Sequence, residues 1–272
     1  MTELVIEADR VERQYWRDLW RYRELFLFFA WRDLLVRYKQ TVVGVSWSLV
    51  RPLLTVGVLT IVFGRLGKMP ADGIPYPLLV LCGMIPWQFF STAMSETGNS
   101  LVNNSGMISK IYFPRLVIAV STVITSMVDF LLSSCFLVVL MMWYHYAPPL
   151  AVLFLPFFVL LVFAASLGVG MWIAALTVEY RDFRIIVPFI VQFGLYISPV
   201  GFRSSIVPAR FRLLYALNPM VGTIDGFRWC LLGDSRGIYW PSVGIAVLEV
   251  AVILITGLRY FRKTERTFAD VI

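Results

Sequence analysis

Three ionisable residues lie inside long apolar stretches of the sequence: Arg51, Asp129 and Glu249. An ionisable group is costly in such surroundings, so each one needs a functional or a structural explanation. A proton or ion pathway would require a relay or a coordinating cluster, and three residues on three separate stretches support one only weakly. Arg51 and Asp129 could instead form a structural pair or lie beside a water-filled path. Contact with a substrate is the remaining alternative.

Motifs for catalysis and nucleotide binding are missing from the sequence. The segment GRLGK at residues 64–68 is too short for a phosphate-binding loop and lacks the Ser or Thr that would hold magnesium. There is no HExxH, GxSxG or CxxC motif, and no pair of carboxylates is spaced for acid–base catalysis. Cys82, Cys135 and Cys230 have no pairing or metal-ligand spacing, and His145 is the sole histidine. We expect no catalytic site, no metal, no cofactor and no disulfide in this chain.

Composition indicates which elements must position these residues. Of the 272 residues, 59% are hydrophobic and only 15% are charged, and the mean hydropathy is +0.76. These values are far from those of a soluble domain. Six apolar stretches are each near the length that crosses a hydrocarbon core of about 30 Å. They are residues 42–63, 77–94, 116–144, 150–178, 185–200 and 240–260. The sequence therefore predicts an all-α membrane protein with one six-helix domain over residues 42–260.

The segment before the first stretch mixes aromatic and basic side chains at helical spacing. Residues 12–40 fit a helix that lies along the cytosolic headgroups with its apolar side in lipid. A soluble amphipathic helix packed on a partner is the alternative. We place this helix within a cytosolic segment of residues 1–41, and a second cytosolic segment, a tail, at residues 261–272.

The distribution of Lys and Arg predicts the orientation of the chain. Basic residues flank the apolar stretches on one side about twice as often as on the other, and cytosolic loops carry such an excess. Both termini are therefore expected in the cytosol. The net charge of +7 is explained by this topology, because the basic residues do not gather into one nucleic-acid-binding domain.

The outer segment between the last two spans, residues 201–239, is too apolar for an ordinary solvated loop. It could form two short helices broken at Asn218 and Pro219 that fold back into the membrane, with protein or water around their free backbone groups. An amphipathic cap on the outer surface fits the sequence equally well.

A series of short motifs runs in order through nearly the whole chain. They are Arg32 and Asp33 with RYKQT at residues 37–41, then Gly44, Trp47 and Pro52, GMIPWQFF at 83–90, Asn99, Ser100, Asn103 and Asn104, KIYFPR at 110–115, EYRDF at 179–183, SPV at 198–200, and LNPM at 217–220 with Gly226, Phe227, Arg228 and Gly233. Together with six spans, this series resembles the type-2 ABC exporter permeases that move polysaccharides. The similarity is strongest to the O-antigen and lipopolysaccharide export branch.

This resemblance implies a homodimer in a bacterial inner membrane that works with two copies of a separate ATP-hydrolysing subunit. ATP and magnesium would be bound by that partner, and the cargo would be a lipid-linked glycan that moves from cytoplasm to periplasm. Capsule and teichoic acid exporters are close alternatives, and a drug-export permease is a more distant one. From other classes, a proton-coupled transporter or an enzyme acting on lipid-linked sugars would remain.

The resemblance also implies a coupling helix for the ATPase within residues 96–115. The candidate contacts there are Asn103, Asn104, Lys110, Tyr112, Phe113 and Arg115. Pro114 would end the helix before the third span. Arg181 and Asp182, in the EYRDF motif, would form a second and smaller contact. An ordinary polar loop with membrane anchors is the alternative.

A glycan path favours aromatic side chains, because sugar rings present apolar C–H faces beside their hydroxyls. The candidates are Trp47 on the first span and Phe189, Phe193 and Tyr196 on the fifth, a choice of spans that follows the resemblance. Interfacial or core packing is the alternative role for aromatic residues. Arg37 and Lys39 lie where a lipid pyrophosphate would arrive at the cytosolic headgroups, and ordinary membrane anchoring explains them as well.

Overall fold

Helices joined by turns and short loops form the described part of the chain. The computed structural model describes residues 12–39, 44–71, 73–108, 110, 113–233, 238–265 and 268, and for residues 12–14, 44–49 and 51 the backbone alone. Every secondary-structure element in this part of the chain is a helix, and no strand occurs in it. The prediction of an all-α protein is confirmed for these residues.

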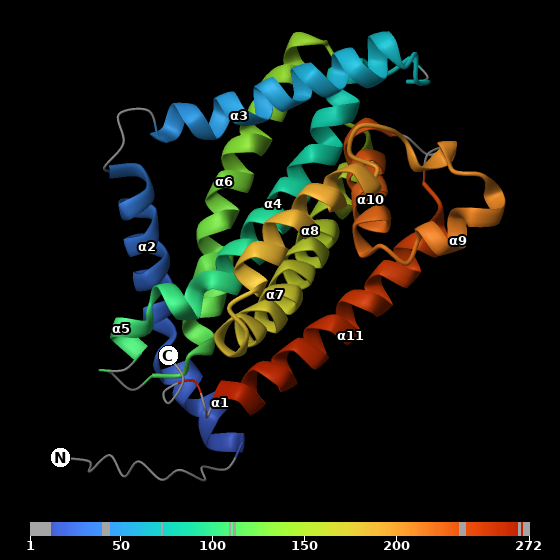
Figure 1. Cartoon of the computed structure of the whole chain (residues 1–272). Coiled ribbons are helices and arrows are strands. Elements are labelled where there is room, and N and C mark those ends of the chain that lie inside the picture. Colours follow the sequence, from blue (N-terminus) through green and yellow to red (C-terminus); the bar gives the residue numbers. More distant parts are fainter. Residues whose placement is uncertain are drawn as a thin grey trace.

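The helices follow one another along the chain with short connections (Figure 1). They are α1 Glu12–Arg21, α2 Arg23–Lys39, α3 Gly44–Leu59 with the π-helical η1 Thr60–Leu66, α4 Tyr76–Asn103, α5 Ser105–Ile108, α6 Leu116–Trp143, η2 Leu150–Phe154 with α7 Leu155–Glu179, α8 Phe183–Ile197, η3 Ser204–Ile206, η4 Ala209–Phe211, α9 Arg212–Tyr215, α10 Pro219–Leu232 and α11 Trp240–Glu265.

Four helices are long and apolar enough to cross a membrane. They are α4, α6, the combined Leu150–Glu179 and α11, with 26 to 30 residues each. The other two predicted spans correspond to α3–η1 and α8, whose described apolar stretches, Pro52–Leu66 and Phe183–Ile197, are shorter. Helix α8 ends at Ile197 because the next residue, Ser198, precedes Pro199. Ser198 adopts the extended conformation that a following proline favours.

Helix α4 is the centre of the bundle and is longer than the sequence predicted. Of its most apolar 18-residue window, 83% is buried, against 28% to 33% in the other three long helices. The predicted span ended at Met94, but the helix continues to Asn103. The first residues of the predicted 96–115 coupling loop are therefore helical. Their polar side chains have partners within the bundle, as between the hydroxyls of Thr97 and Thr122, which lie 2.8 Å apart.

Close helix contacts form at small residues. A Cβ on Gly170 of α7 would lie 2.7 Å from the Thr97 side chain, and one on Gly98 of α4 would lie 2.5 Å from Ile173. Helix α11 approaches α7 in the same way, because a Cβ on Gly257 would lie 2.5 Å from the carbonyl oxygen of Gly168. Glycine is needed where helices approach this closely, and α4, α7 and α11 therefore pack as one unit.

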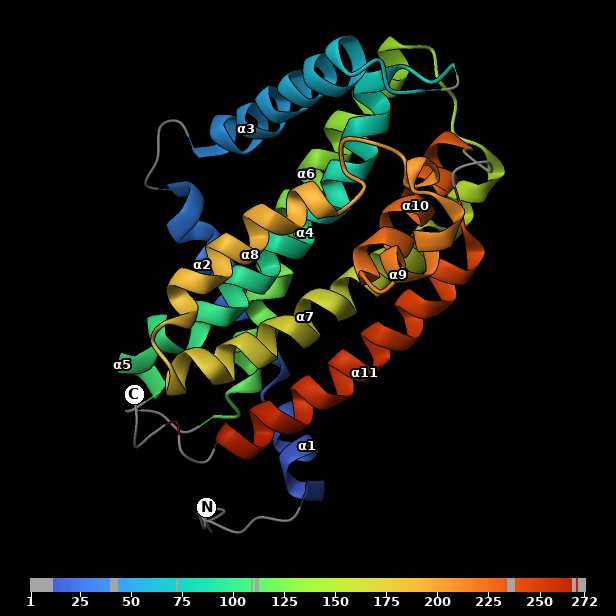
Figure 2. The ribbon, with the colours of Figure 1, turned by 45° about the vertical axis from the view of Figure 1, so that its right-hand side comes forward.

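Most residues of helix α10 are buried, and both views of the ribbon show this helix beside the long helix α11 (Figures 1 and 2). The Asn218 side chain accepts a hydrogen bond from the Met220 N–H at 3.0 Å, Pro219 is the first helical residue, and Gly233 ends the helix with a φ of 66°. The break between α9 and α10 thus falls at the predicted Asn218 and Pro219. Helix α10 packs on α4, α7 and α11.

The bundle has two ends, which we name after their short helices. The α5 end contains α1, α5, the α7–α8 connection and the last turn of α11, whereas the α9 end contains η1, α9 and α10 (Figures 1 and 2). Helix α2 packs along α6 near the α5 end, and α3 crosses the outside of α4 and α6.

Candidate functional site

At the α5 end, helix α2 is joined to the junction between α4 and α5. The Arg32 Nη2 donates a hydrogen bond to the Asn104 Oδ1 at 2.8 Å, and the Asn104 Nδ2 donates to the carbonyl oxygen of Ser100 at 2.8 Å. Asn104 directly follows the last residue of α4 and caps its C-terminus. The predicted coupling residue Asn104 is therefore a fixed link between helices, while its neighbour Asn103 is exposed.

The remaining predicted coupling residues after α5 differ in accessibility. Lys110 is exposed, whereas Phe113 is 5% exposed and its ring lies 5.6 Å from that of Phe29 on α2. Phe113 therefore packs inside the protein and does not present its ring to a partner. Tyr112 lies outside the described residues. Of the members of this set that the structure describes, Asn103 and Lys110 are exposed.

Arg115 belongs to a second junction, which the sequence did not reveal. Its backbone N–H, at the start of α6, donates to the Glu265 Oε1 at 2.7 Å, and the Tyr15 hydroxyl of α1 donates to the Glu265 Oε2 at 3.0 Å. Burial, followed by the charge of Glu265, raises the pKa of Tyr15, so the phenol keeps its proton and remains a donor. One carboxylate therefore connects α1, α6 and α11. The partners are too far apart in sequence for a local motif to indicate them.

The second predicted contact, in the α7–α8 connection, lies at the same end of the bundle (Figures 1 and 2). Arg181 and Asp182 are both exposed there. The structure thus brings Asn103, Lys110, Arg181 and Asp182 to one end of the molecule as exposed polar side chains.

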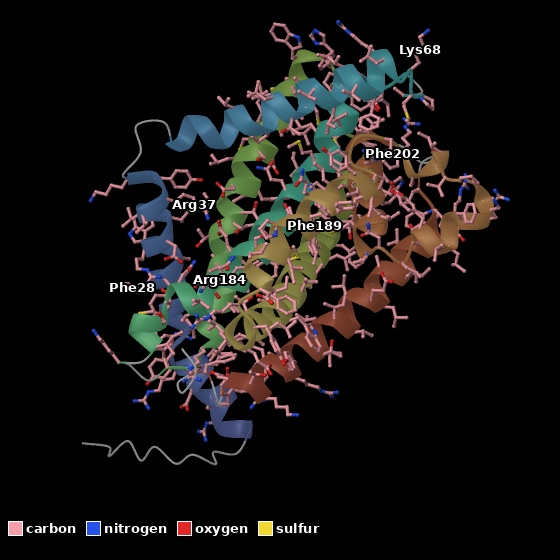
Figure 3. All side chains as sticks on the ribbon, viewed as in Figure 1. Phe28, Arg37, Lys68, Arg184, Phe189 and Phe202 are labelled. Atoms are coloured by element: carbon pink, nitrogen blue, oxygen red, sulfur yellow. The ribbon has the colours of Figure 1, made fainter. Side chains whose placement is uncertain are left out.

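Arg37, a predicted pyrophosphate ligand, forms two ion pairs with carboxylates. Its Nη1 donates to the Asp129 Oδ2 of α6 at 2.5 Å, and its Nη2 donates to the Glu96 Oε1 of α4. Figure 3 shows the Arg37 label between α2 and α6. The Tyr38 hydroxyl donates to the other Asp129 oxygen, and the Ser126 hydroxyl donates to the Glu96 Oε2 at 3.3 Å. We name these five residues the Arg37 network.

The carboxyl groups of this network explain why Arg37 stays protonated. Burial on its own would lower the pKa of the guanidinium, but the nearby Glu96 and Asp129 carboxylates outweigh it, and the pKa of Arg37 is raised. Arg37 therefore remains a cation that pairs with the carboxyl groups of Glu96 and Asp129. Lys39, predicted to act with it, is exposed.

The charges predicted inside the membrane do not gather at one place. Asp129 lies on α6 and is paired with Arg37 of α2, whereas Glu249 lies on α11. Helices α4 and α7 separate α6 from α11 (Figure 1). The Oε2 of Glu249 is buried and has no hydrogen-bond partner in the described part of the chain. The side chain of Arg51 lies outside the described residues, so the pairing predicted for it with Asp129 stays a prediction.

Helix α8 presents an exposed aromatic face. Phe189, Phe193 and Tyr196 are 60%, 55% and 64% exposed, and the rings of Phe189 and Phe193 lie 4.7 Å apart. Their spacing along the helix places them on one side, and Val187 is the residue of α8 that is buried. Figure 3 labels Phe189 on the ribbon of α8. The side chain of Trp47, the fourth predicted residue of the glycan path, lies outside the described residues.

Glu96 is a member of the Arg37 network that sequence reasoning missed. The polar run that follows Met94 predicted a loop, and a carboxylate in a loop has no partner that the sequence can indicate. Its helical position on α4 is what aims it at Arg37. Polar residues at helical spacing after the apolar stretch are the sequence signal that could have predicted a helical Glu96.

Known proteins similar to this chain are named as export permeases or transport proteins. The O-antigen export system permease protein RfbA of Myxococcus xanthus is 27% identical over 258 residues, which are 94% of this chain and 98% of that protein. A protein of the same name from Klebsiella pneumoniae is 25% identical over 92% of this chain and 95% of its own length. The polysialic acid transport protein KpsM of Escherichia coli is 21% identical over 86% and 91%.

The sequence profile of one family covers most of the helices described above. The profile described as ABC-2 type transporter matches residues 24–232, from α2 to the end of α10. The match takes in the Arg37 network, the α4–α5 junction and the aromatic face of α8. Because it covers more than half of the chain, this protein belongs to the ABC-2 type transporter family.

Proposed function

We propose that this chain is the membrane subunit of an ATP-driven exporter that moves a lipid-linked polysaccharide of the O-antigen type from cytoplasm to periplasm. The observation that carries the proposal is the similarity, over 94% of this chain and 98% of the relative, to a protein named as an O-antigen export permease. The family match over residues 24–232 supports the part of the proposal that makes this chain a membrane subunit of an ABC transporter.

The working unit is a homodimer of this chain with two copies of a separate ABC ATPase, located in the bacterial inner membrane. ATP and magnesium are bound by the ATPase, and this chain supplies the path. The α5 end faces the cytosol together with both termini. The exposed cations at or near that end, Arg17, Arg21, Lys110, Arg181 and Lys263, support this orientation.

In this proposal, α3–η1 and α8 complete a set of six spans. Helices α3 and η1 are contiguous over residues 44–66, a length of about 34 Å at an α-helical rise. Helix α8, with 15 residues, is only about 22 Å long, so the outer segment must complete its passage. The burial of α10 among α4, α7 and α11 supports a re-entrant outer segment over a surface cap.

Helices α1 and α2 form the interface element of the proposal. Trp20, Leu27, Phe28 and Trp31 are exposed large apolar side chains, and the guanidinium of Arg23 lies 5.4 Å from the Trp20 ring. Such a surface suits the boundary between headgroups and acyl chains, where amphipathic helices bind.

Force from the ATPase enters at the exposed residues Asn103 and Lys110. It passes through the Arg32–Asn104 hydrogen bond to α2, and α4 carries it toward the α9 end. The exposed rings of Phe189, Phe193 and Tyr196 then contact the sugar, because aromatic faces pack against C–H groups without fixing the chain by directional bonds.

The test is reconstitution of this chain with its ATPase in lipid vesicles. Adding a lipid-linked O-antigen should raise the rate of ATP hydrolysis, and the polymer should appear inside inverted vesicles, where it is protected from a glycosidase. An ATPase that binds but does not hydrolyse ATP is the matched control and should give no transport. Transport at an equal rate with that control would refute the proposal.

A capsule-type polymer is the second candidate cargo, and the similarity to the polysialic acid transport protein KpsM favours it. The same vesicles distinguish the two cargoes. If polysialic acid on a lipid anchor stimulates ATP hydrolysis and the O-antigen does not, the chain is a capsule exporter.

A further inference from the structure

Within the Arg37 network, one guanidinium holds α2 against two long helices. Arg37 of α2 is paired with Glu96 of α4 and with Asp129 of α6. We infer that Glu96 and Asp129 are positioning residues that keep Arg37 away from anionic headgroups, and that an arriving lipid diphosphate displaces them from Arg37 and frees α2. This inference rests on the proposed function, because it concerns how the lipid carrier is admitted.

The balance of charge is the first step of the argument. Two carboxylates surround one guanidinium, so the three groups carry a net negative charge when all are ionised. A diphosphate that approached the intact arrangement would meet two like charges. Once α2 has moved, the guanidinium fork is available, and it binds phosphate oxygens in the same bidentate way as carboxylates. The two states therefore exchange one set of anionic partners for another.

Partial exposure makes such an exchange physically reasonable. The side chains of Arg37, Glu96 and Asp129 are 30%, 32% and 24% exposed. A sealed ion pair would be cut off from a ligand, and a fully exposed pair would not hold α2 firmly. An intermediate position, near the C-terminal end of an interface helix, gives both access and strength.

After an exchange, the carboxylates keep some of their hydrogen bonds. The Ser126 hydroxyl donates to Glu96 at 3.3 Å from within the bundle, on α6. The Tyr38 hydroxyl bonds to Asp129 from α2, so it would leave with Arg37. Water that enters with the lipid headgroup would satisfy the carboxylates, because the site is already partly open.

The position of the network links it to the ATPase contact. Arg32, on the same helix as Arg37, is bonded to Asn104 at the end of α4. A displacement of α2 at Arg37 therefore acts on the α4–α5 junction beside the exposed Asn103 and Lys110. In this way, arrival of the carrier lipid can be sensed at the surface where the ATPase binds.

Binding to the complete permease–ATPase complex in phosphatidylcholine nanodiscs tests the inference. The probe is a long-chain polyprenyl diphosphate, with inorganic pyrophosphate in a second arm to separate headgroup binding from lipid binding. Glu96→Gln and Asp129→Asn should each bind the lipid about five-fold more tightly. Arg37→Gln should bind it about ten-fold more weakly, and adding Glu96→Gln to that variant should restore nothing. Unchanged or weaker binding by both carboxylate variants would overturn the inference.

A matched control and a second readout guard against variants that merely unfold. Ser134→Ala, on α6 but outside the Arg37 network, removes a hydroxyl that donates to the carbonyl oxygen of Phe130 at 2.8 Å and leaves the charge unchanged, so its affinity should stay within about two-fold of the unmodified protein. In a Cys135→Ser background, spin labels at Val36 and Leu131, both exposed, should move apart when the lipid diphosphate is added. An unchanged distance would refute the displacement of α2.

The two hypotheses fail in different ways. If the affinities and distances follow the expected pattern but a lipid-linked glycan does not stimulate ATP hydrolysis, the proposed export function is wrong and the lipid-binding site stands. If export proceeds normally while neither Glu96→Gln nor Asp129→Asn binds the lipid more tightly, the site inference is wrong and the export function stands.

Discussion

Arg228 of α10 reaches the N-terminal half of α4, where its Nε donates to the carbonyl oxygen of Leu79 at 3.2 Å. The same guanidinium donates from Nη1 to Phe202 and from Nη2 to Val200, both at 2.8 Å, and the residue is only 2% exposed. A Cβ on Gly83 would lie 2.6 Å from it, so α4 leaves room for the guanidinium. Arg228 therefore fixes the outer segment to the centre of the bundle.

Replacing Arg228 with Met should destabilise the outer segment. Three carbonyl oxygens, those of Leu79, Val200 and Phe202, would lose a donor, and we expect a loss of about 3 kcal/mol in the free energy of unfolding. The measurement is thermal unfolding in detergent together with limited proteolysis of residues 201–215. Arg210→Met is the control, because the exposed Arg210 lies over the Phe211 ring and should be nearly neutral. Equal stability of the two variants would contradict the role given to Arg228.

Gly226→Ala should also destabilise the protein, for a steric reason. A Cβ at this position would lie 1.9 Å from the Cε1 of Phe158 on α7, so α10 would have to shift. We expect a loss of roughly 2 kcal/mol. Gly244→Ala on α11 meets nothing within 4 Å and should be neutral or slightly stabilising. Thermal unfolding of both variants measures the difference, and a neutral Gly226→Ala would mean that α10 is not packed as described.

The sequence predicted the long helices well because their apolar composition is a local property. It placed the end of α4 too early, since hydropathy measures side chains and the residues after Met94 are polar. The helix continues because those polar groups find partners in the bundle, as Thr97 does when its hydroxyl lies 2.8 Å from that of Thr122 on α6. A window average cannot contain information about such partners.

The candidate site was predictable in its types of residue but not in their contacts. Arg37 and Asp129 were both singled out, yet they are 92 positions apart, and no spacing rule connects them. Phe113 looked like a surface contact, but it packs on Phe29. By contrast, Phe189, Phe193 and Tyr196 share one helix, so their common face follows from helical periodicity alone.

Glu265→Ala should release α1 from the bundle. The Tyr15 hydroxyl and the Arg115 N–H would both lose their acceptor. Trypsin should then cut at the exposed Arg17 and Arg21 several times faster, because cleavage follows local opening. Glu24→Ala, at an exposed position of α2, is the control and should leave the cleavage rate unchanged. Equal rates in all three proteins would refute the anchoring role of Glu265.

Lys110→Glu should weaken binding of the ATPase. Lys110 is exposed beside α5, and a charge reversal at an interface replaces attraction with repulsion. We expect about a ten-fold loss of affinity, which corresponds to about 1.4 kcal/mol, measured by titrating the ATPase onto the permease in nanodiscs. Lys68→Glu, at the α9 end (Figure 3), is the matched control. If it weakened binding as much as Lys110→Glu, the ATPase would not dock specifically at the α5 end.

Replacing Phe193 with Ala should slow export without impairing ATPase binding. Phe193 is exposed on α8 beside Phe189, so its removal takes an aromatic surface from the proposed path while leaving the core intact. Loss of ring stacking on one sugar is worth about 1 kcal/mol, or about a five-fold lower rate if that contact is made in the slowest step. Leu153→Ala removes an apolar side chain that is equally outside the core, on η2, and should leave the rate unchanged. The measurement is the initial rate of polymer uptake into inverted vesicles at saturating ATP. A normal rate for Phe193→Ala, with a reduced rate for Leu153→Ala, would place the glycan elsewhere, because only a residue that touches the moving polymer can slow it without changing the coupling to ATP.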